Sequence, residues 1–223
     1  MSDHQLGLAA AFLSDIESVR IATENRVRSM TEEGDIRTAL ADRLQMHAET
    51  LLAVEHAATL DLQREMRRHP LGPWVKGRVG IGLKQGARML AAIGDPYMRP
   101  AMFDEDDNEV EPERPRRGPG ELWQYAGHGD PARSQRRKGQ RVQFSPEAKM
   151  RVHLVAESCI KQAHSPYRPV YDAARASWAD REVSDGHKHN HGLRLVGKAI
   201  LKDLFLEARA LATGVEDEQR VAA

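Results

Sequence analysis

The sequence contains little cysteine, few aromatic residues and no long apolar run. Cys159 is the one cysteine among 223 residues, so the chain cannot form an internal disulfide, as is usual in a reducing compartment. Only 5% of the residues are aromatic and 30% are charged, which predicts a thin, aliphatic core. No apolar stretch approaches the roughly 20 residues that span a bilayer, and the N-terminal region lacks the apolar core of a signal peptide. These absences predict a soluble intracellular protein.

An excess of one charge is also absent, because Lys plus Arg and Asp plus Glu number 33 each. Overall charge therefore neither favours nor excludes a nucleic-acid partner, and the distribution along the chain must decide. The densest basic segment, which contains no acidic residue, consists of Arg133, Arg136, Arg137, Lys138 and Arg141 with their neighbours. Such density predicts a segment that binds a polyanion, and a solvated loop is the alternative.

Two long stretches of helical periodicity open the chain. Apolar residues recur at helical spacing in residues 5–31 and again from Ile36 to Met66. Between them, Gly34 can end the first helix and Asp35 can cap the second, so we expect an antiparallel helical hairpin in residues 1–70. Because two long apolar stripes exceed what a thin domain can cover, the region 5–68 is predicted to self-associate as a coiled coil. A monomeric hairpin folded against the rest of the chain is the alternative.

The stretch "VGIGLKQGARMLAAIGD" follows the hairpin region. Gly80 and Gly82 predict a tight turn before a helix, where amide hydrogens can hold a phosphate oxygen. Lys84 and Arg88, one helical turn apart, would add positive charge to that side. These features predict a helix-hairpin-helix DNA-binding unit in residues 71–102, with a corner used only for packing as the alternative.

Residues 103–120 have no periodicity and are first acidic, then rich in proline and arginine. This composition predicts a disordered insertion. We interpret its consecutive carboxylates as a solvated charge run, so we predict no metal site and no cofactor.

Residues 121–213 are predicted to form a basic helical region, followed by a tail at 214–223. Ser145 is expected to cap a helix whose apolar face includes Val152, Val155 and Cys159, which makes this cysteine a core residue.

Alternating histidines precede the last predicted helix, near residues 193–212. His187, His189 and His191 are expected in a polar loop, with a zinc site as the alternative. In the helix itself the basic residues repeat every four positions and predict a basic ridge, formed by Arg194, Lys198 and Lys202.

The stretch from Trp74 to Ala212 resembles the C-terminal transposase domain of the DEDD insertion-sequence transposases, a family that includes RNA-guided recombinases and site-specific DNA invertases. The matching segments are "VGIGLKQGARMLAAIGDP", "LWQYAGHGDPARSQRRKGQ" and "SPYRPVYDAAR", followed by the basic last helix. In that family a long paired-helix element precedes this domain, as it is expected to here.

The resemblance also implies a serine nucleophile soon after the "YAG" segment, for which Ser134 is the nearest match; an ordinary surface serine is the alternative. Family members begin with a RuvC-like domain whose four carboxylates bind divalent metal, and we expect no room for that domain in this chain. The chain alone is therefore not expected to be an active transposase.

Together these features predict a mostly α fold: a long antiparallel helical hairpin, then a helical domain that contains a helix-hairpin-helix. The predicted function is DNA binding by a transposase-related protein, in the cytoplasm or on the nucleoid, with structured RNA as a second candidate partner and no membrane partner. One alternative is a compact serine-dependent transposase or recombinase that acts with a separate RuvC-like subunit. The other is a helical interaction protein that does not bind DNA.

Overall fold

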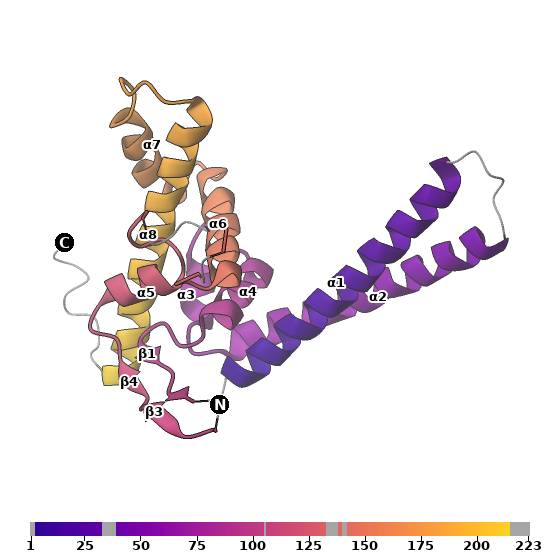
Figure 1. Ribbon diagram of the computed structural model, residues 1–223, viewed down its shortest axis with the longest axis horizontal. Helices are drawn as coiled ribbons and strands as arrows, with labels where there is room; N and C mark the ends of the chain where they lie inside the picture. Colours follow the sequence, from indigo (N-terminus) through magenta and orange to yellow (C-terminus); the bar gives the residue numbers. More distant parts are fainter. Residues whose placement is uncertain (1–2, 33–38, 105, 133–137, 140–141, 215–223) are drawn as a thin grey trace.

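The computed structural model describes residues 3–32, 39–104, 106–132, 138–139 and 142–214 (Figure 1). These residues are mostly helical, which confirms the predicted fold class. The helices are α1 (Asp3–Glu32), α2 (Ala39–Arg68), α3 (Gly72–Gly77), α4 (Leu83–Ile93), α5 (Pro119–Tyr125), α6 (Pro146–Ile160), α7 (Arg168–Ala176) and α8 (Asp185–Thr213). The short strands are β1 (Met98–Arg99), β2 (Met102–Phe103), β3 (Glu109–Glu111) and β4 (Arg114–Pro115). No described helix combines the length and apolar character that a membrane span requires.

Helices α1 and α2 form the predicted antiparallel hairpin, which projects from the helical body as an arm (Figure 1). The buried residues of α2 along the arm are small: Ala41, Ala48 and Ala58. Small side chains let two helices approach closely, and the larger Leu62 and Met66 take over where α2 joins the core of the body. The predicted turn residues Gly34 and Asp35 lie outside the described residues.

One charged group interrupts the seam of this arm. Arg20 of α1 donates its Nε hydrogen to Glu55 of α2, and its Nη1 atom lies 2.8 Å from each carboxylate oxygen of Glu24. The side chains of Arg20 and Glu55 are only 17% and 14% exposed. Because a polar pair inside a helix seam favours one register, this group favours the observed alignment of α1 and α2.

The core of the body lies around α6, which contacts both α4 and α8. Its start is fixed by Ser145, whose Oγ accepts a hydrogen bond of 3.2 Å from the backbone N–H of Ala148, as predicted for an N-cap. Val152, Val155 and Cys159 are buried on one face, also as predicted. Burial raises the pKa of the Cys159 thiol to about 11, so the thiol is protonated at neutral pH and serves as a core side chain.

The sequence predicts a disordered insertion at residues 103–120, but the described residues of this segment form short strands and the start of a helix. Strand β1 pairs with β4 and β2 pairs with β3, both antiparallel, and α5 begins at the end of the segment. The Asp104 carboxylate accepts backbone hydrogen bonds from Asp106 and Asn108 at 3.0 and 2.9 Å, which closes the turn between β2 and β3. Strands of two or three residues are too short to leave a periodic pattern in the sequence, and the Asp104 turn supplies the order instead.

The last helix begins about two turns earlier than the sequence predicts. Ser184 is its N-cap, with Oγ accepting a hydrogen bond of 3.3 Å from the backbone N–H of His187, and Asp185 occupies the first turn. His187, His189 and His191 therefore lie on a helix, not in the predicted loop. Residues two apart on a helix point in nearly opposite directions, so His189 faces away from His187 and His191, which are four residues apart and share a face. Among the described residues, no group of three or more His, Cys, Asp or Glu side chains could hold a metal ion.

Each of the three histidines has its own neighbour. His187 Nδ1 lies 2.8 Å from the N-cap hydroxyl, and His189 Nδ1 lies 2.6 Å from the hydroxyl of Tyr171. The ring of His191 stacks on Trp178 with 3.8 Å between ring centroids. Two of these contacts join α8 to α7 and to the residues that follow α7, so the histidines contribute to packing at this end of the molecule.

Candidate nucleic-acid interface

The glycine turn between α3 and α4 has a packed half and an open half. Gly80 has a φ of +98°, and a Cβ built there would lie 2.6 Å from the Cα atom of Cys159, so this glycine lets the turn pack on α6. Gly82 is the N-cap of α4 with a φ of −75°, and a Cβ there would meet no atom within 4 Å. A helix follows the turn, as predicted, but only Gly82 leaves space for a phosphate.

Lys84 and Arg88, both predicted as DNA contacts, pair with the arm instead. Lys84 Nζ lies 2.8 Å from one carboxylate oxygen of Glu17 in α1; Arg88 Nη2 pairs with the other oxygen and lies 3.2 Å from Ser14 Oγ. The Arg88 side chain is only 7% exposed. Because a buried, paired guanidinium cannot reach DNA, the prediction for Arg88 is corrected: it anchors the arm to the body, and Lys84 does the same at the rim.

The electrostatics of this anchor follow from its geometry. Partial burial alone would raise the pKa of Glu17, but hydrogen bonds from Arg88 and Lys84, together with their charges, outweigh burial and lower it. Glu17 is therefore a carboxylate across the neutral pH range, and it accepts from two cations of α4. The spacing of Lys84 and Arg88 places them on one face of the helix, but spacing alone does not tell which neighbour that face meets.

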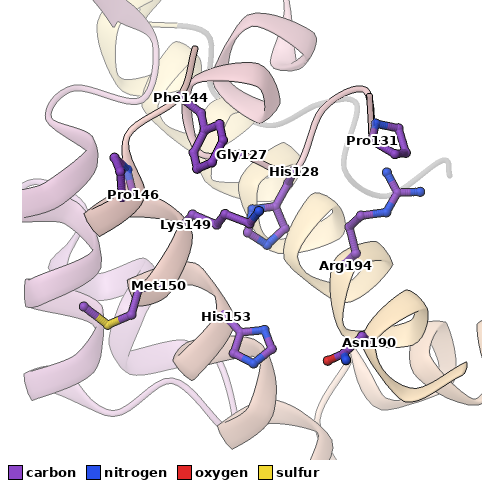
Figure 2. Close-up of a pocket in the computed structure, with 10 residues that line it drawn as sticks. All are labelled: Gly127, His128, Pro131, Phe144, Pro146, Lys149, Met150, His153, Asn190 and Arg194. Atoms are coloured by element: carbon purple, nitrogen blue, oxygen red, sulfur yellow. The ribbon is translucent and has the colours of Figure 1, made fainter. Parts of the chain in front are cut away.

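A pocket of about 570 Å³ lies where the loop after α5, the start of α6 and α8 meet (Figure 2). It is lined by Gly127, His128, Pro131, Phe144, Pro146, Lys149, Met150, His153, Asn190 and Arg194. Among these described residues the polar side chains are basic or neutral, and none is a carboxylate. The pocket is therefore locally cationic in a chain whose formal net charge is zero.

His128 lies at the centre of this group of side chains (Figure 2). It is 4% exposed, and its Nδ1 atom lies 2.7 Å from the carbonyl oxygen of Ala126. Since a carbonyl only accepts, Nδ1 carries the hydrogen and Nε2 keeps its lone pair. Burial lowers the pKa of His128 to about 4, with smaller contributions from neighbouring cations, so the ring is neutral at pH 7. It rests on Gly197 of α8, where a Cβ would lie 2.5 Å from the ring.

Two cations from different helices reach the same pocket. Lys149 Nζ lies 4.6 Å from the centroid of the Phe144 ring, and burial lowers the pKa of this lysine. Arg194 donates a hydrogen bond of 3.1 Å from Nη1 to the carbonyl oxygen of Gly129. The charges of both cations add to the lowering of the His128 pKa that burial causes. An anion in the pocket would gain from both cations at once.

The predicted basic ridge continues from the pocket along α8. Lys198 lies above Trp123, with Nζ 4.9 Å from the ring centroid, and the indole N–H of Trp123 donates to the Lys198 carbonyl oxygen at 2.9 Å. Burial and the charge of Arg194 lower the pKa of Lys198, while Asp130 raises it. Lys202 is exposed. The ridge therefore extends the cationic character of the pocket over about two turns of the helix.

The basic segment predicted to bind a polyanion begins and ends near this pocket. Pro131 and Phe144, which flank it in sequence, both line the pocket, and Lys138 is exposed. The other predicted contacts of the segment, and the candidate nucleophile, lie outside the described residues: Arg133, Arg136, Arg137, Arg141 and Ser134.

Several pocket residues were not identified from the sequence: His128, Lys149, His153 and Asn190. In the sequence His128 lies between Gly127 and Gly129. Two flanking glycines indicate that the backbone there can approach another part of the protein closely. Lys149 and His153 lie four residues apart, which places both on one face of α6. Asn190 belongs to helical turns of α8 for which the sequence predicts a polar loop, so its position does not follow from the sequence.

Comparisons of the chain with protein-family models, with curated proteins and with solved structures found no match.

Proposed function

We propose that this protein binds nucleic acid through the phosphate backbone, using the cationic pocket and the basic ridge of α8. The observation that carries the proposal is the composition of the pocket, where the cations Lys149 and Arg194 meet beside the neutral His128 without a lining carboxylate. Groups of like charge are costly to hold together unless a partner neutralises them, and a polyanion does so while releasing its counterions.

Two further observations support the same surface. Pro131 and Phe144, which flank the basic segment in sequence, both line the pocket. Lys202 adds an exposed charge on the same helix as Arg194. The resemblance to the C-terminal domain of DEDD transposases favours DNA over RNA as the polymer. Binding of this kind positions the backbone and reads little sequence.

Duplex binding measured by fluorescence anisotropy at several salt concentrations tests the proposal. Neutralising one phosphate contact, by Lys149→Gln or Lys202→Gln, should weaken binding to all sequences alike and reduce the slope of log affinity against log salt by about 0.9. The matched control is Arg26→Gln, which removes an exposed positive charge from the arm and should leave the slope unchanged.

A parent protein that binds neither duplex nor single-stranded DNA at low salt would overturn the proposal and favour a helical interaction protein. Equal effects of all three variants would show that the pocket is not the contact surface. Circular dichroism of each variant separates a lost contact from a lost fold.

A further inference from the structure

The pocket beside the α8 ridge has features that binding to a phosphate backbone does not require. Contacts to duplex phosphates need only exposed cations, whereas this site is a concavity of about 570 Å³, within the range of small-molecule pockets. Its cations share the space with an apolar wall formed by Pro131, Phe144, Pro146 and Met150. A phosphate alone gains nothing from such a wall, but a nucleotide has both an anionic group and a flat apolar base.

One remaining polar group suits the edge of a base. It is not His128, whose Nδ1–H is donated to the carbonyl oxygen of Ala126 and whose Nε2 packs against Gly197 of α8. Asn190 is exposed and carries both a donor and an acceptor on its amide. Bases removed from a stack are recognised by hydrogen bonds to such edges and by contact with aromatic and apolar side chains.

We propose that the pocket holds one unpaired nucleotide, with its phosphate beside Arg194 and Lys149 and its base against Phe144 and Met150. This inference rests on the proposed nucleic-acid binding and adds to it. A base inside a duplex is stacked on both faces and cannot enter such a pocket. The ligand is therefore a nucleotide in a bulge, gap or single strand, and the ridge holds the flanking backbone.

Three matched DNA duplexes test this step: one fully paired, one with a single bulged 2-aminopurine, and one with an abasic residue at the bulge. We expect the 2-aminopurine bulge to bind about tenfold or more tightly than the other two, because stacking of one base on protein side chains is worth roughly this factor or more. The 2-aminopurine fluorescence should change on binding, as its base leaves one stack and enters another environment.

Variants then assign the effect to the pocket. Phe144→Leu removes the aromatic ring but keeps apolar volume, and Asn190→Ala removes one exposed amide with little risk to folding. Both should reduce the preference for the 2-aminopurine bulge over the abasic bulge, whereas Lys202→Gln should weaken binding to all three duplexes equally.

The outcomes separate the two levels of the proposal. Equal affinity for all three duplexes, with a salt dependence that Lys202→Gln reduces, would overturn the nucleotide pocket and leave backbone binding in place. If the protein binds none of the three duplexes, both the nucleotide pocket and the proposed backbone binding are overturned. A bulge preference that survives Phe144→Leu and Asn190→Ala would show that the base is read elsewhere, and would also overturn the pocket assignment.

Discussion

Glu17 joins the arm to the body through two basic residues of α4. Because Arg88 is nearly buried, loss of its partner leaves a desolvated charge with fewer hydrogen bonds. We expect Glu17→Gln to lower the free energy of unfolding by about 2 kcal/mol, in the range of hydrogen bonds to charged groups. Urea unfolding measures this change. The control is Asp61→Asn, which breaks an exposed pair with Arg64 and should cost less than about 0.5 kcal/mol.

The pH dependence of this pair has a defined direction. Because the pKa of Glu17 is below its ordinary value of 4.5, its stabilisation is complete above that pH and is lost as the pH falls through the lowered pKa. The difference between the parent and Glu17→Gln should therefore shrink in acid. A difference that is the same at neutral and strongly acidic pH would contradict the ion-pair origin of the effect.

His128 also makes the stability depend on pH, but by another route. Folding favours the neutral form of this ring, whereas it favours the charged form of Glu17. Its pKa falls from 6.5 to about 4, so the unfolded chain binds more protons between these pH values and stability declines as the pH drops through that window. The full shift corresponds to about 3 kcal/mol. We expect His128→Gln to flatten the pH dependence of urea unfolding between about pH 4 and 6.5. If the variant and the parent show the same slope in that window, His128 is not the group responsible.

At the scale of elements, the glycine turn between α3 and α4 permits a comparison of two neighbouring positions. Gly80→Ala would place a Cβ against the α6 backbone and require a positive φ, so we expect a loss of at least about 2 kcal/mol of stability. Gly82→Ala meets no neighbour and should cost less than about 1 kcal/mol, mainly through the weaker N-cap. Thermal unfolding of both variants measures the difference. Equal losses would mean that Gly80 does not pack on α6 as described.

The elements also show what the sequence could reveal. The arm was predictable because α1 and α2 carry long periodic patterns, and α4 was predictable because glycines bound it on both sides. The start of α8 was missed because its first turns are rich in histidine and contain no apolar repeat, although Ser184 and Asp185 form an ordinary N-terminus. The partner of Arg88 could not be predicted, since periodicity orients a helix face but does not identify Glu17, 71 residues earlier, as its neighbour.

At the scale of the whole molecule, α1 leaves a row of apolar side chains exposed to solvent. Leu8, Phe12 and Val19 are 59%, 52% and 52% exposed and lie on one face of α1. The sequence predicts self-association through residues 5–68, and this face is where we expect it. In sedimentation equilibrium of the full chain, the parent should associate, and the double variant Phe12→Gln, Val19→Gln should be monomeric with unchanged helicity. Ile21→Gln, on another face of α1, is the control.

Association through the arms would give each assembly two cationic pockets. A duplex long enough to reach the basic surfaces of both copies would then bind with an effective concentration set by the geometry of the arms, whereas a duplex that reaches one surface would gain nothing. We therefore expect the monomeric double variant to lose about tenfold or more in affinity for the long duplex and to bind the short duplex as the parent does. Equal losses on both duplexes would instead indicate that the variant has damaged the pocket, and no loss on either would mean that the two pockets act independently on DNA.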